Sequence, residues 1–177
     1  MGALTAVPFL LASVMAAAAA ESHRPAVLVF HVDAGPGASP QAGQDLGDAV
    51  LQVTRGSEAF GRVISLQELA SVVPPDEMKR MGSCTDVCGG ELADSTGADW
   101  VITAEVTRNG QASTLVLRLF LARGGSAFVA RAPLGRAAGA ALAGPVRSAL
   151  ADVLGQAKLT GVSARPASGP TPPARPR

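Results

Sequence analysis

The chain of 177 residues contains no tyrosine and one tryptophan, and only 3% of its residues are aromatic. Acidic residues are missing from its end, where the charged residues after Asp152 are all basic: Lys158, Arg165, Arg175 and Arg177. Because the net charge of the whole chain is only +1, the remainder is mildly acidic. An acidic body with few aromatic side chains is a poor binder of nucleic acid. We therefore expect no nucleic-acid partner.

Charge is also absent from the first 20 residues, and residues 3–20 are apolar or small. This run is too short and too rich in alanine for a good membrane-spanning helix. It ends in three alanines before Glu21, the small-residue pattern that signal peptidase recognises. We expect residues 1–20 to be a signal peptide cleaved near Ala20, which leaves a periplasmic or secreted protein without an integral membrane segment. An uncleaved anchor is the alternative.

The chain has only two cysteines, Cys84 and Cys88, so lipid attachment at a cysteine near the start is not expected. Metal binding would need two more ligands, but the two histidines, His23 and His31, are far away in sequence. A catalytic dithiol normally has the spacing C-x-x-C, which is one residue shorter. In an exported protein two lone cysteines usually pair. A disulfide is therefore the favoured interpretation, and it fits best if Cys84 precedes the helix that contains Cys88.

Sequence motifs for catalysis and for cofactor binding are missing as well. The loop DAGPGAS (residues 33–39) follows a strand and precedes a helix, where anion sites occur. It matches neither G-x-x-x-x-G-K-[ST] nor G-x-G-x-x-G, so a tight turn into a capped helix is favoured. His31 and Asp33 resemble half of an acid–base pair, but the sequence supplies no serine elbow or second carboxylate. We predict no catalytic residue, no metal and no cofactor.

What the sequence does contain is a regular alternation of strand and helix patterns. A continuous apolar run at 26–32 is typical of a strand that is covered on both faces. Ser39 followed by Pro40 predicts the start of a helix. An amphipathic pattern continues that helix to near Arg55.

A second strand is predicted at 61–65, and Ser65 with Glu68 forms the capping box of a second helix. This helix is expected to end at Pro74, and the apolar residues expected to face inward are Leu66, Leu69 and Val72. A further helix is predicted to stop at Gly97, because glycine readily takes the left-handed conformation at a helix end.

After Gly97 the hydrophobic period changes from 3.6 to 2 residues, which predicts three antiparallel strands. They cover 100–107, 115–121 and 126–132, and Asn109-Gly110 is a hairpin signal between the first two. A last amphipathic helix is expected from Arg136, with a kink at Pro145.

The predicted order is therefore β-α-β-α-α-β-β-β-α. The first two strands are parallel and need a right-handed crossover, while the antiparallel meander extends the same sheet. The expected fold class is α/β, with a mixed sheet flanked by helices. We assign this domain to residues 25–159, which is long enough to bury roughly two thirds of its unfolded-chain surface. Residues 160–177, rich in proline and arginine, hold too little apolar surface to offset ordering and are expected to be a disordered tail.

Three motifs also carry a resemblance: VIS leading into a capped helix (63–69), L-A-x-x-x-G-A-D-x-V-I-x-x-x-V (92–106), and a hairpin into L-x-L-R-L (115–119). Over about residues 26–133 the chain resembles an α/β domain of bacterial envelope proteins. It is similar to the N-terminal domain of TolB and to CsgG- and LpoB-like lipoproteins, and exported proteins of myxobacterial type resemble it in their two cysteines. The chain differs in having no lipidation cysteine and no β-propeller.

The resemblance implies a non-enzymatic binding or assembly role with an envelope protein as partner, and it supplies no catalytic residues. Binding surfaces tend to lie on loops held by a rigid scaffold. The candidate partner surface is therefore Asp33 and Ser39 in one loop and Met78 and Met81 in another, where the methionines offer adaptable apolar contact. Core packing of both methionines is the alternative. Edge pairing by residues 126–132 is a second route to a partner.

Two other functions stay open from the sequence. A secreted small-ligand binder or enzyme would use the loops 33–39 and 84–88, and would need a polar pocket lined by His31 or Asp33. A third possibility is a structural fragment that has no activity without a neighbouring domain.

Overall fold

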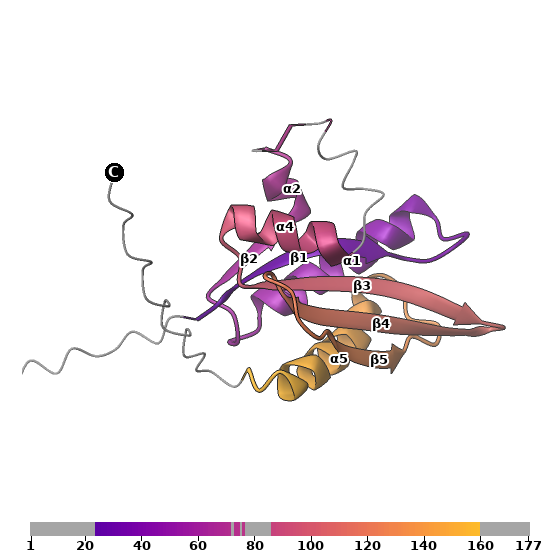
Figure 1. The fold of residues 1–177 in the computed structure, drawn as a ribbon. Helices are drawn as coiled ribbons and strands as arrows, with labels where there is room; N and C mark the ends of the chain where they lie inside the picture. The colour runs from indigo at the N-terminus through magenta and orange to yellow at the C-terminus, as the bar shows by residue number, and fades with distance from the viewer. Residues whose placement is uncertain (1–23, 72, 75, 77–85, 160–177) are drawn as a thin grey trace, which may run out of the picture.

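The structure is a computed structural model that describes residues 24–71, 73–74, 76 and 86–159 (Figure 1). The expected signal peptide (1–20) and the expected tail (160–177) lie outside the described residues. The segment 77–85, which contains Met78, Met81 and Cys84, also lies outside them.

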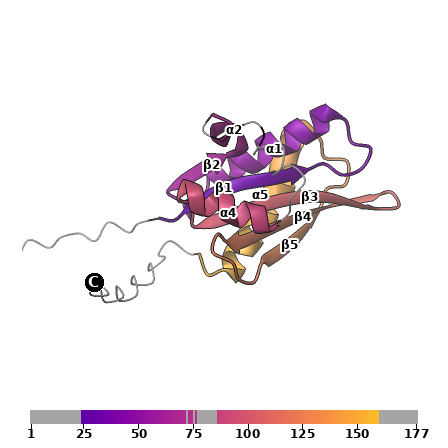
Figure 2. The same cartoon turned by 45° about the horizontal axis from the view of Figure 1, so that its top comes forward.

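Five strands form one mixed sheet with the strand order β2-β1-β3-β4-β5. The strands are β1 (Ala26–Asp33), β2 (Arg62–Ser65), β3 (Trp100–Asn109), β4 (Ala112–Leu121) and β5 (Phe128–Pro133). β1 pairs in parallel with both β2 and β3, and the pairs β3–β4 and β4–β5 are antiparallel. Figures 1 and 2 show the long β3–β4 hairpin extending beyond the helices at one end of the sheet. The predicted mixed sheet and the α/β class are confirmed.

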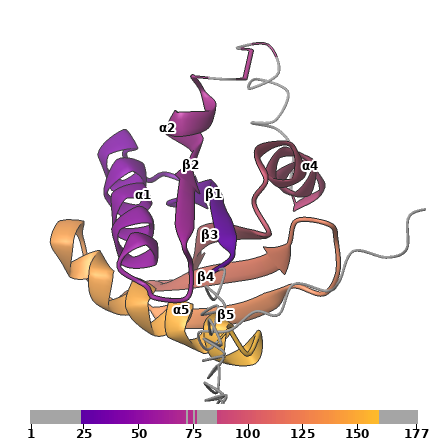
Figure 3. The same ribbon diagram turned by 90° about the vertical axis from the view of Figure 1, so that its left-hand side faces the viewer.

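Helices cover both faces of the sheet, as the view along the strands in Figure 3 shows. α1 (Pro40–Arg55) and α5 (Ala143–Gln156) pack on one face, and a 3-10 turn, η1 (Gly139–Leu142), leads into α5. α2 (Leu66–Leu69) and α4 (Asp86–Thr96) pack on the other face. Because β1 is covered from both sides, its sequence reads as a continuous apolar run.

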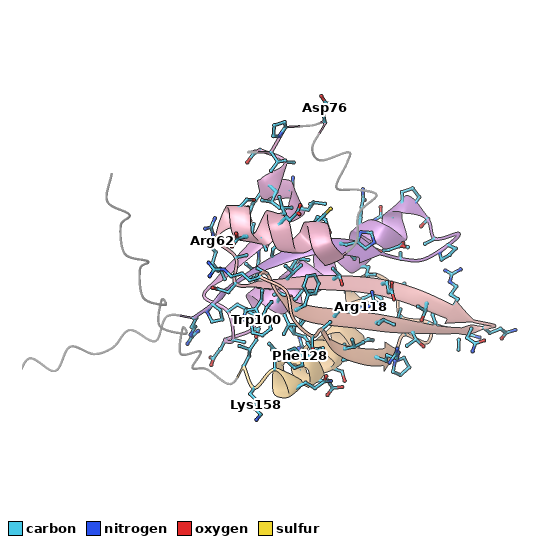
Figure 4. The ribbon with its side chains drawn as sticks, in the orientation of Figure 1. Arg62, Asp76, Trp100, Arg118, Phe128 and Lys158 are labelled. Carbon is cyan, nitrogen blue, oxygen red and sulfur yellow. The ribbon has the colours of Figure 1, made fainter. Side chains whose placement is uncertain are left out.

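Two hydrophobic clusters hold these layers together. The cluster under α1 and α5 is the larger, and its fully buried members include Leu46, Val50, Ile102, Leu115, Leu117, Leu119, Val146 and Val153. Trp100 and Phe128 belong to this side, with ring centroids 6.2 Å apart (Figure 4). The cluster under α2 and α4 is smaller and is built around Leu28, Phe30, Ile64, Leu69, Leu92 and Phe120. Side chains that alternate along each strand therefore enter different clusters.

The cap signals in the sequence are confirmed, and the predicted hairpin turn lies one residue later than expected, at Gly110-Gln111, because Asn109 pairs with Ala112. The Ser39 side chain accepts a hydrogen bond from the N–H of Ala42, which caps α1. Ser65 and Glu68 form the reciprocal capping box of α2. Gly97, directly after α4, has a φ of 72°, and this left-handed conformation favours glycine.

Four details of the helices differ from the prediction. α2 ends at Leu69 rather than at Pro74. Leu66 was expected to face inward but is 39% exposed, because α2 is a single turn and only Leu69 reaches the core. The last helix begins at Ala143 rather than Arg136, after the 3-10 turn. Pro145 is the third residue of α5, where its missing N–H removes no intrahelical bond. The kink expected at Pro145 is replaced by the change from 3-10 to α geometry before Ala143.

Candidate functional site

Three loops that are far apart in sequence meet at the end of the sheet where β1 finishes (Figures 1 and 2). The first is the loop 34–38 between β1 and α1, the second is the β3–β4 hairpin, and the third is the segment that follows β5 and runs into the start of η1 (134–139). All three line one cleft with a volume of about 240 Å³, which we call the loop cleft. The parallel β1–β3 pair and the antiparallel meander fix these loops relative to one another.

The loop 34–38 is held close to β3 by a glycine. Gly35 has a φ of 84°, and a Cβ atom at this position would lie 2.5 Å from the backbone oxygen of Val106. The Asp33 carboxylate accepts a hydrogen bond from the N–H of Gly35 at 2.8 Å. Asp33 and Ser39, both exposed, therefore use their side-chain oxygens in the turn and in the helix cap. Their predicted role in a partner surface stays a prediction.

The floor of the loop cleft is apolar and its rim is charged. Buried side chains of the larger core cluster form the floor: Leu46, Val106, Leu134 and Leu142. Arg108 from the hairpin and Arg136 from the segment after β5 lie on the rim, and both are exposed. Asp45 of α1 is the acidic lining residue. The cleft thus combines an apolar interior with a positive rim.

Neither arginine of the rim is neutralised within the part of the chain that the structure describes. The ion pairs there join Arg55 to Glu68, Arg118 to Glu105 and Arg123 to Asp94. Asp45 instead accepts a hydrogen bond from the side-chain amide of Gln41 at 2.7 Å. The two guanidinium groups of the loop cleft therefore have no carboxylate within 4.0 Å among residues 24–71 and 86–159.

His31 and Asp33 lie on the other face of the sheet. A register shift between Val29 and His31 places His31 opposite Thr103 and Asp33 opposite Glu105. Side chains at these two positions of β3 alternate with those that enter the α1–α5 cluster. His31 and Asp33 therefore do not line the loop cleft. Whether the loops 33–39 and 84–88 form a pocket stays open, because Cys84 lies outside the described residues.

The surroundings of His31 offer no catalytic arrangement within the described residues. The Thr103 hydroxyl is buried and has no hydrogen-bond partner there, and no hydrogen bond of His31 orients the imidazole. Arg118, labelled in Figure 4, forms a half-exposed ion pair with Glu105 at 2.9 Å across β3 and β4. In residues 24–71, 73–74, 76 and 86–159 no group of three His, Cys, Asp or Glu side chains could hold a metal ion.

Cys88 lies in the first turns of α4 and packs, half-buried, against the smaller core cluster. The next two residues bring α4 very close to the sheet. A Cβ at Gly89 would meet the Phe30 ring at 3.1 Å, and one at Gly90 would meet the Ala122 carbonyl oxygen at 2.7 Å. The described part of the chain contains no free cysteine. Because Cys84 lies outside it, the Cys84–Cys88 disulfide stays a prediction.

The strand expected at 126–132 is β5 (Phe128–Pro133), which starts two residues later and forms one edge of the sheet. Hydrogen-bonded positions alternate along an antiparallel pair. The N–H of Leu134 donates to the carbonyl of Ser113 at 2.9 Å, which fixes the alternation. The outward-facing backbone groups therefore belong to Val129, Arg131 and Pro133. The edge is short, and proline removes one of its outward donors.

Sequence reasoning did not identify Arg108 and Arg136 as site residues. Arg108 precedes the Asn109-Gly110 hairpin signal, and Arg136 follows Gly135, so each reads as an exposed loop residue. They converge only because β3, β4 and β5 pair in register and because α1 crosses back over the sheet. No local signal in the sequence marks this convergence.

Comparisons with known proteins found structural similarities only. No protein-family model matches the sequence, and no curated protein matches it either. Among the described residues no helix is long and apolar enough to cross a membrane.

Several solved structures are similar to this chain. The C-terminal domain of LpoB from Salmonella enterica matches with a TM-score of 0.45 and 17% identity, over 67% of this chain and 87% of that domain. TolB from Acinetobacter baumannii matches with a TM-score of 0.44 and 11% identity, over 76% of this chain and 28% of TolB. The lipoprotein GNA1162 from Neisseria meningitidis gives 0.39 and 18% identity, over 76% of this chain and 96% of that one.

LpoB and TolB are also the proteins that the sequence motifs resemble. The TM-scores below 0.5 mark these as distant similarities, from which no activity or partner follows for this chain. This chain matches little more than a quarter of TolB's length.

Proposed function

We propose that the protein is an exported, non-enzymatic interaction module of the periplasm or cell envelope. Its partner surface would be the end of the domain around the loop cleft. The observation that carries this proposal is the convergence of the three loops on one cleft with an apolar floor and two unneutralised arginines. A sheet with helices on both faces is a rigid scaffold, and loops on such scaffolds commonly bind partners.

The alternative, a secreted enzyme or small-ligand binder, is supported less well. It would need a polar pocket lined by His31 or Asp33, where the loops 33–39 and 84–88 meet. In the described residues these two side chains lie on the sheet face opposite the loop cleft. An acid–base site needs its groups within hydrogen-bonding reach of each other or of substrate.

The proposed surface can be tested by placing a charge in it. Ala38 lines the loop cleft, and Ala127 lies in the exposed β4–β5 loop at the opposite end of the sheet. We expect Ala38→Glu to abolish capture of an envelope protein by immobilised domain, and Ala127→Glu to leave it unchanged. Captured proteins are identified by mass spectrometry, and binding is then repeated with the purified candidate. Equal capture by both variants would place the partner surface elsewhere.

The segment that contains Met78 and Met81 supplies a second part of the proposed surface. We expect Met78→Glu and Met81→Glu to weaken capture of the same partner without changing the thermal unfolding midpoint. If the substitutions unfold the domain, both methionines are core residues and this part of the surface is wrong. If the protein captures no envelope component but turns over a small substrate, the enzyme interpretation replaces the proposal.

A further inference from the structure

The geometry of the loop cleft points to the chemistry of its ligand. We propose that the cleft binds the free C-terminal carboxylate of a partner polypeptide together with its last, apolar side chain. This inference rests on the proposed function and specifies which part of the partner enters the domain.

The interior of the loop cleft suits an apolar side chain. Its floor is made by Leu46, Val106, Leu134 and Leu142, which belong to the larger core cluster. Its walls are formed mainly by small alanines of the loop 34–38, of α1 and of the segment 134–139. The floor side chains themselves are only 1–9% exposed, and the small alanines around them leave the volume of the cleft for a ligand. Burying an apolar side chain against such a floor removes apolar surface from water, which is favourable.

The rim of the cleft suits an anion. Arg108 lies two residues after Val106 on the same face of β3, so it borders the floor directly. Arg136 approaches from the segment after β5, and neither guanidinium has a carboxylate within 4.0 Å among the described residues. Asp45 also lines the cleft, and its hydrogen bond from the neutral Gln41 amide leaves its negative charge in place. Two guanidinium groups against one carboxylate still give the lining a net positive charge. Guanidinium groups bind carboxylates through paired N–H donors.

The start of α1 adds to the positive potential at the cleft. α1 has 16 residues and no acidic side chain in its first turn, and Ala42 of that turn lines the cleft. The N-terminal end of a helix carries a partial positive charge that favours an anion nearby. The positive potential of the helix start adds to that of the two arginines, and it does not define the site by itself.

The size of the cleft favours a chain end over an internal acidic residue. Its volume of about 240 Å³ lies below the roughly 300–1,000 Å³ of ordinary small-molecule pockets. At a C-terminus the carboxylate and the last side chain share one Cα atom. An internal segment would have to bring in a second residue and the backbone on both sides of it. A chain end is therefore the smaller unit that presents both groups.

The test is an NMR titration of the purified protein with three short peptides. They are acetyl-Gly-Ala-Leu with a free carboxylate, the same peptide as its C-terminal amide, and acetyl-Leu-Glu-Gly-amide, which carries an internal acid. We expect saturable shifts of the backbone amides in the loop 34–38 and the segment 135–138 with the free acid. The other two peptides should bind at least about tenfold more weakly, since they lack the charge-assisted hydrogen bonds at that position.

Arginine variants locate the binding on the rim. Arg108→Gln and Arg136→Gln should each lower the affinity for the free-acid peptide about tenfold. Arg131→Gln is the matched control, because Arg131 is also exposed on this part of the sheet but lies opposite Val116, on the α4 side. Its affinity should equal that of the unmodified protein. Unchanged thermal midpoints show that all three variants are folded.

Equal affinities for the free-acid and amide peptides would show that the cleft does not recognise a carboxylate. An equal affinity for the internal-acid peptide would show that it does not require the carboxylate of a chain end. If no peptide binds while Ala38→Glu still abolishes capture of the partner, this inference fails and the proposed function stands. If Ala38→Glu has no effect on capture but the free-acid peptide binds, the cleft is a carboxylate site and the proposed partner surface fails.

Discussion

The side-chain amide of Gln156, at the end of α5, donates a hydrogen bond to the backbone carbonyl of Val129 on β5 at 3.2 Å. Val129 faces outward at the edge of the sheet, so this contact occupies an acceptor that another strand could use. Pro133 removes a donor from the same edge. The outward groups of Arg131 remain available. Edge pairing, which the sequence suggested as a route to a partner, is therefore restricted at β5.

Restoring these backbone groups should allow the β5 edge of one molecule to pair with a strand of another. We expect the double variant Gln156→Ala/Pro133→Val to show more concentration-dependent self-association than the unmodified protein in sedimentation velocity. The reason is that the edge regains one free acceptor and one free donor for strand pairing. Gln52→Ala is the control, because Gln52 is an exposed glutamine on α1. Identical sedimentation of the double variant and the control would mean that these two residues do not protect the edge.

The boundary between the domain and the tail should lie at Leu159. This residue is 8% exposed and packs in the larger core cluster. Deleting residues 160–177 should leave the thermal midpoint nearly unchanged, whereas Leu159→Ala in the full chain should cost about 2 kcal/mol of unfolding free energy. Thermal and urea unfolding measure both. A large fall in the midpoint on deletion alone would show that the tail packs on the domain.

Close packing of α4 on the sheet should make Gly90 irreplaceable. A Cβ at Gly90 would lie 2.7 Å from a backbone oxygen, so α4 must shift to accept alanine. We expect Gly90→Ala to lower the free energy of unfolding by about 1–3 kcal/mol. Gly47→Ala is the matched control in α1, where no atom lies within 4 Å of the new Cβ. That variant should gain about 0.5–1 kcal/mol. A gain in both would contradict the close contact.

The predicted disulfide between Cys84 and Cys88 can be tested by thiol labelling of unreduced protein, which should find no free thiol. The ring is very small, so Cys84→Ala should cost only ~1–2 kcal/mol, less than the ~3 kcal/mol of a 15-residue loop. Reductant should destabilise the unmodified protein by the same amount and leave the variant unaffected. Two freely labelled thiols in native protein would show that the cysteines are unpaired.

Export with cleavage near Ala20 predicts the start of the mature chain. Mass spectrometry of protein isolated from its host should find a first residue at or near Glu21, because signal peptidase cleaves after small residues. An intact Met1 in a cytoplasmic fraction would contradict both the export and the proposed envelope role.

Local signals in the sequence predicted most of the fold. Ser39, the Ser65–Glu68 capping box and Gly97 each act through neighbouring backbone groups, so their roles can be read from adjacent residues. The Asn109-Gly110 signal and the strand patterns around it likewise predicted a two-residue hairpin, which the structure places at Gly110-Gln111. The α/β class followed from the order of these elements.

The candidate site could not be predicted in the same way, because its residues meet through long-range pairing. Arg108 and Arg136 are separated in sequence by two strands and become neighbours only in the folded sheet. Leu66 shows the same limit on a smaller scale. Its apolar side chain suggested burial, but the length of α2, which decides its environment, depends on how the chain leaves β2.

The position of β1 between two parallel partners, β2 and β3, has a consequence for how the chain reaches its folded state. β1 pairs Leu28 with Ile64 on one side and with Val101 on the other, so both of its neighbours follow it at long distances in sequence. The β3–β4–β5 meander needs only local turns. Because non-local pairing is slow, we expect the meander to form first and β1 to insert last. The slowest step of folding is then the pairing of β1 with β2 and β3.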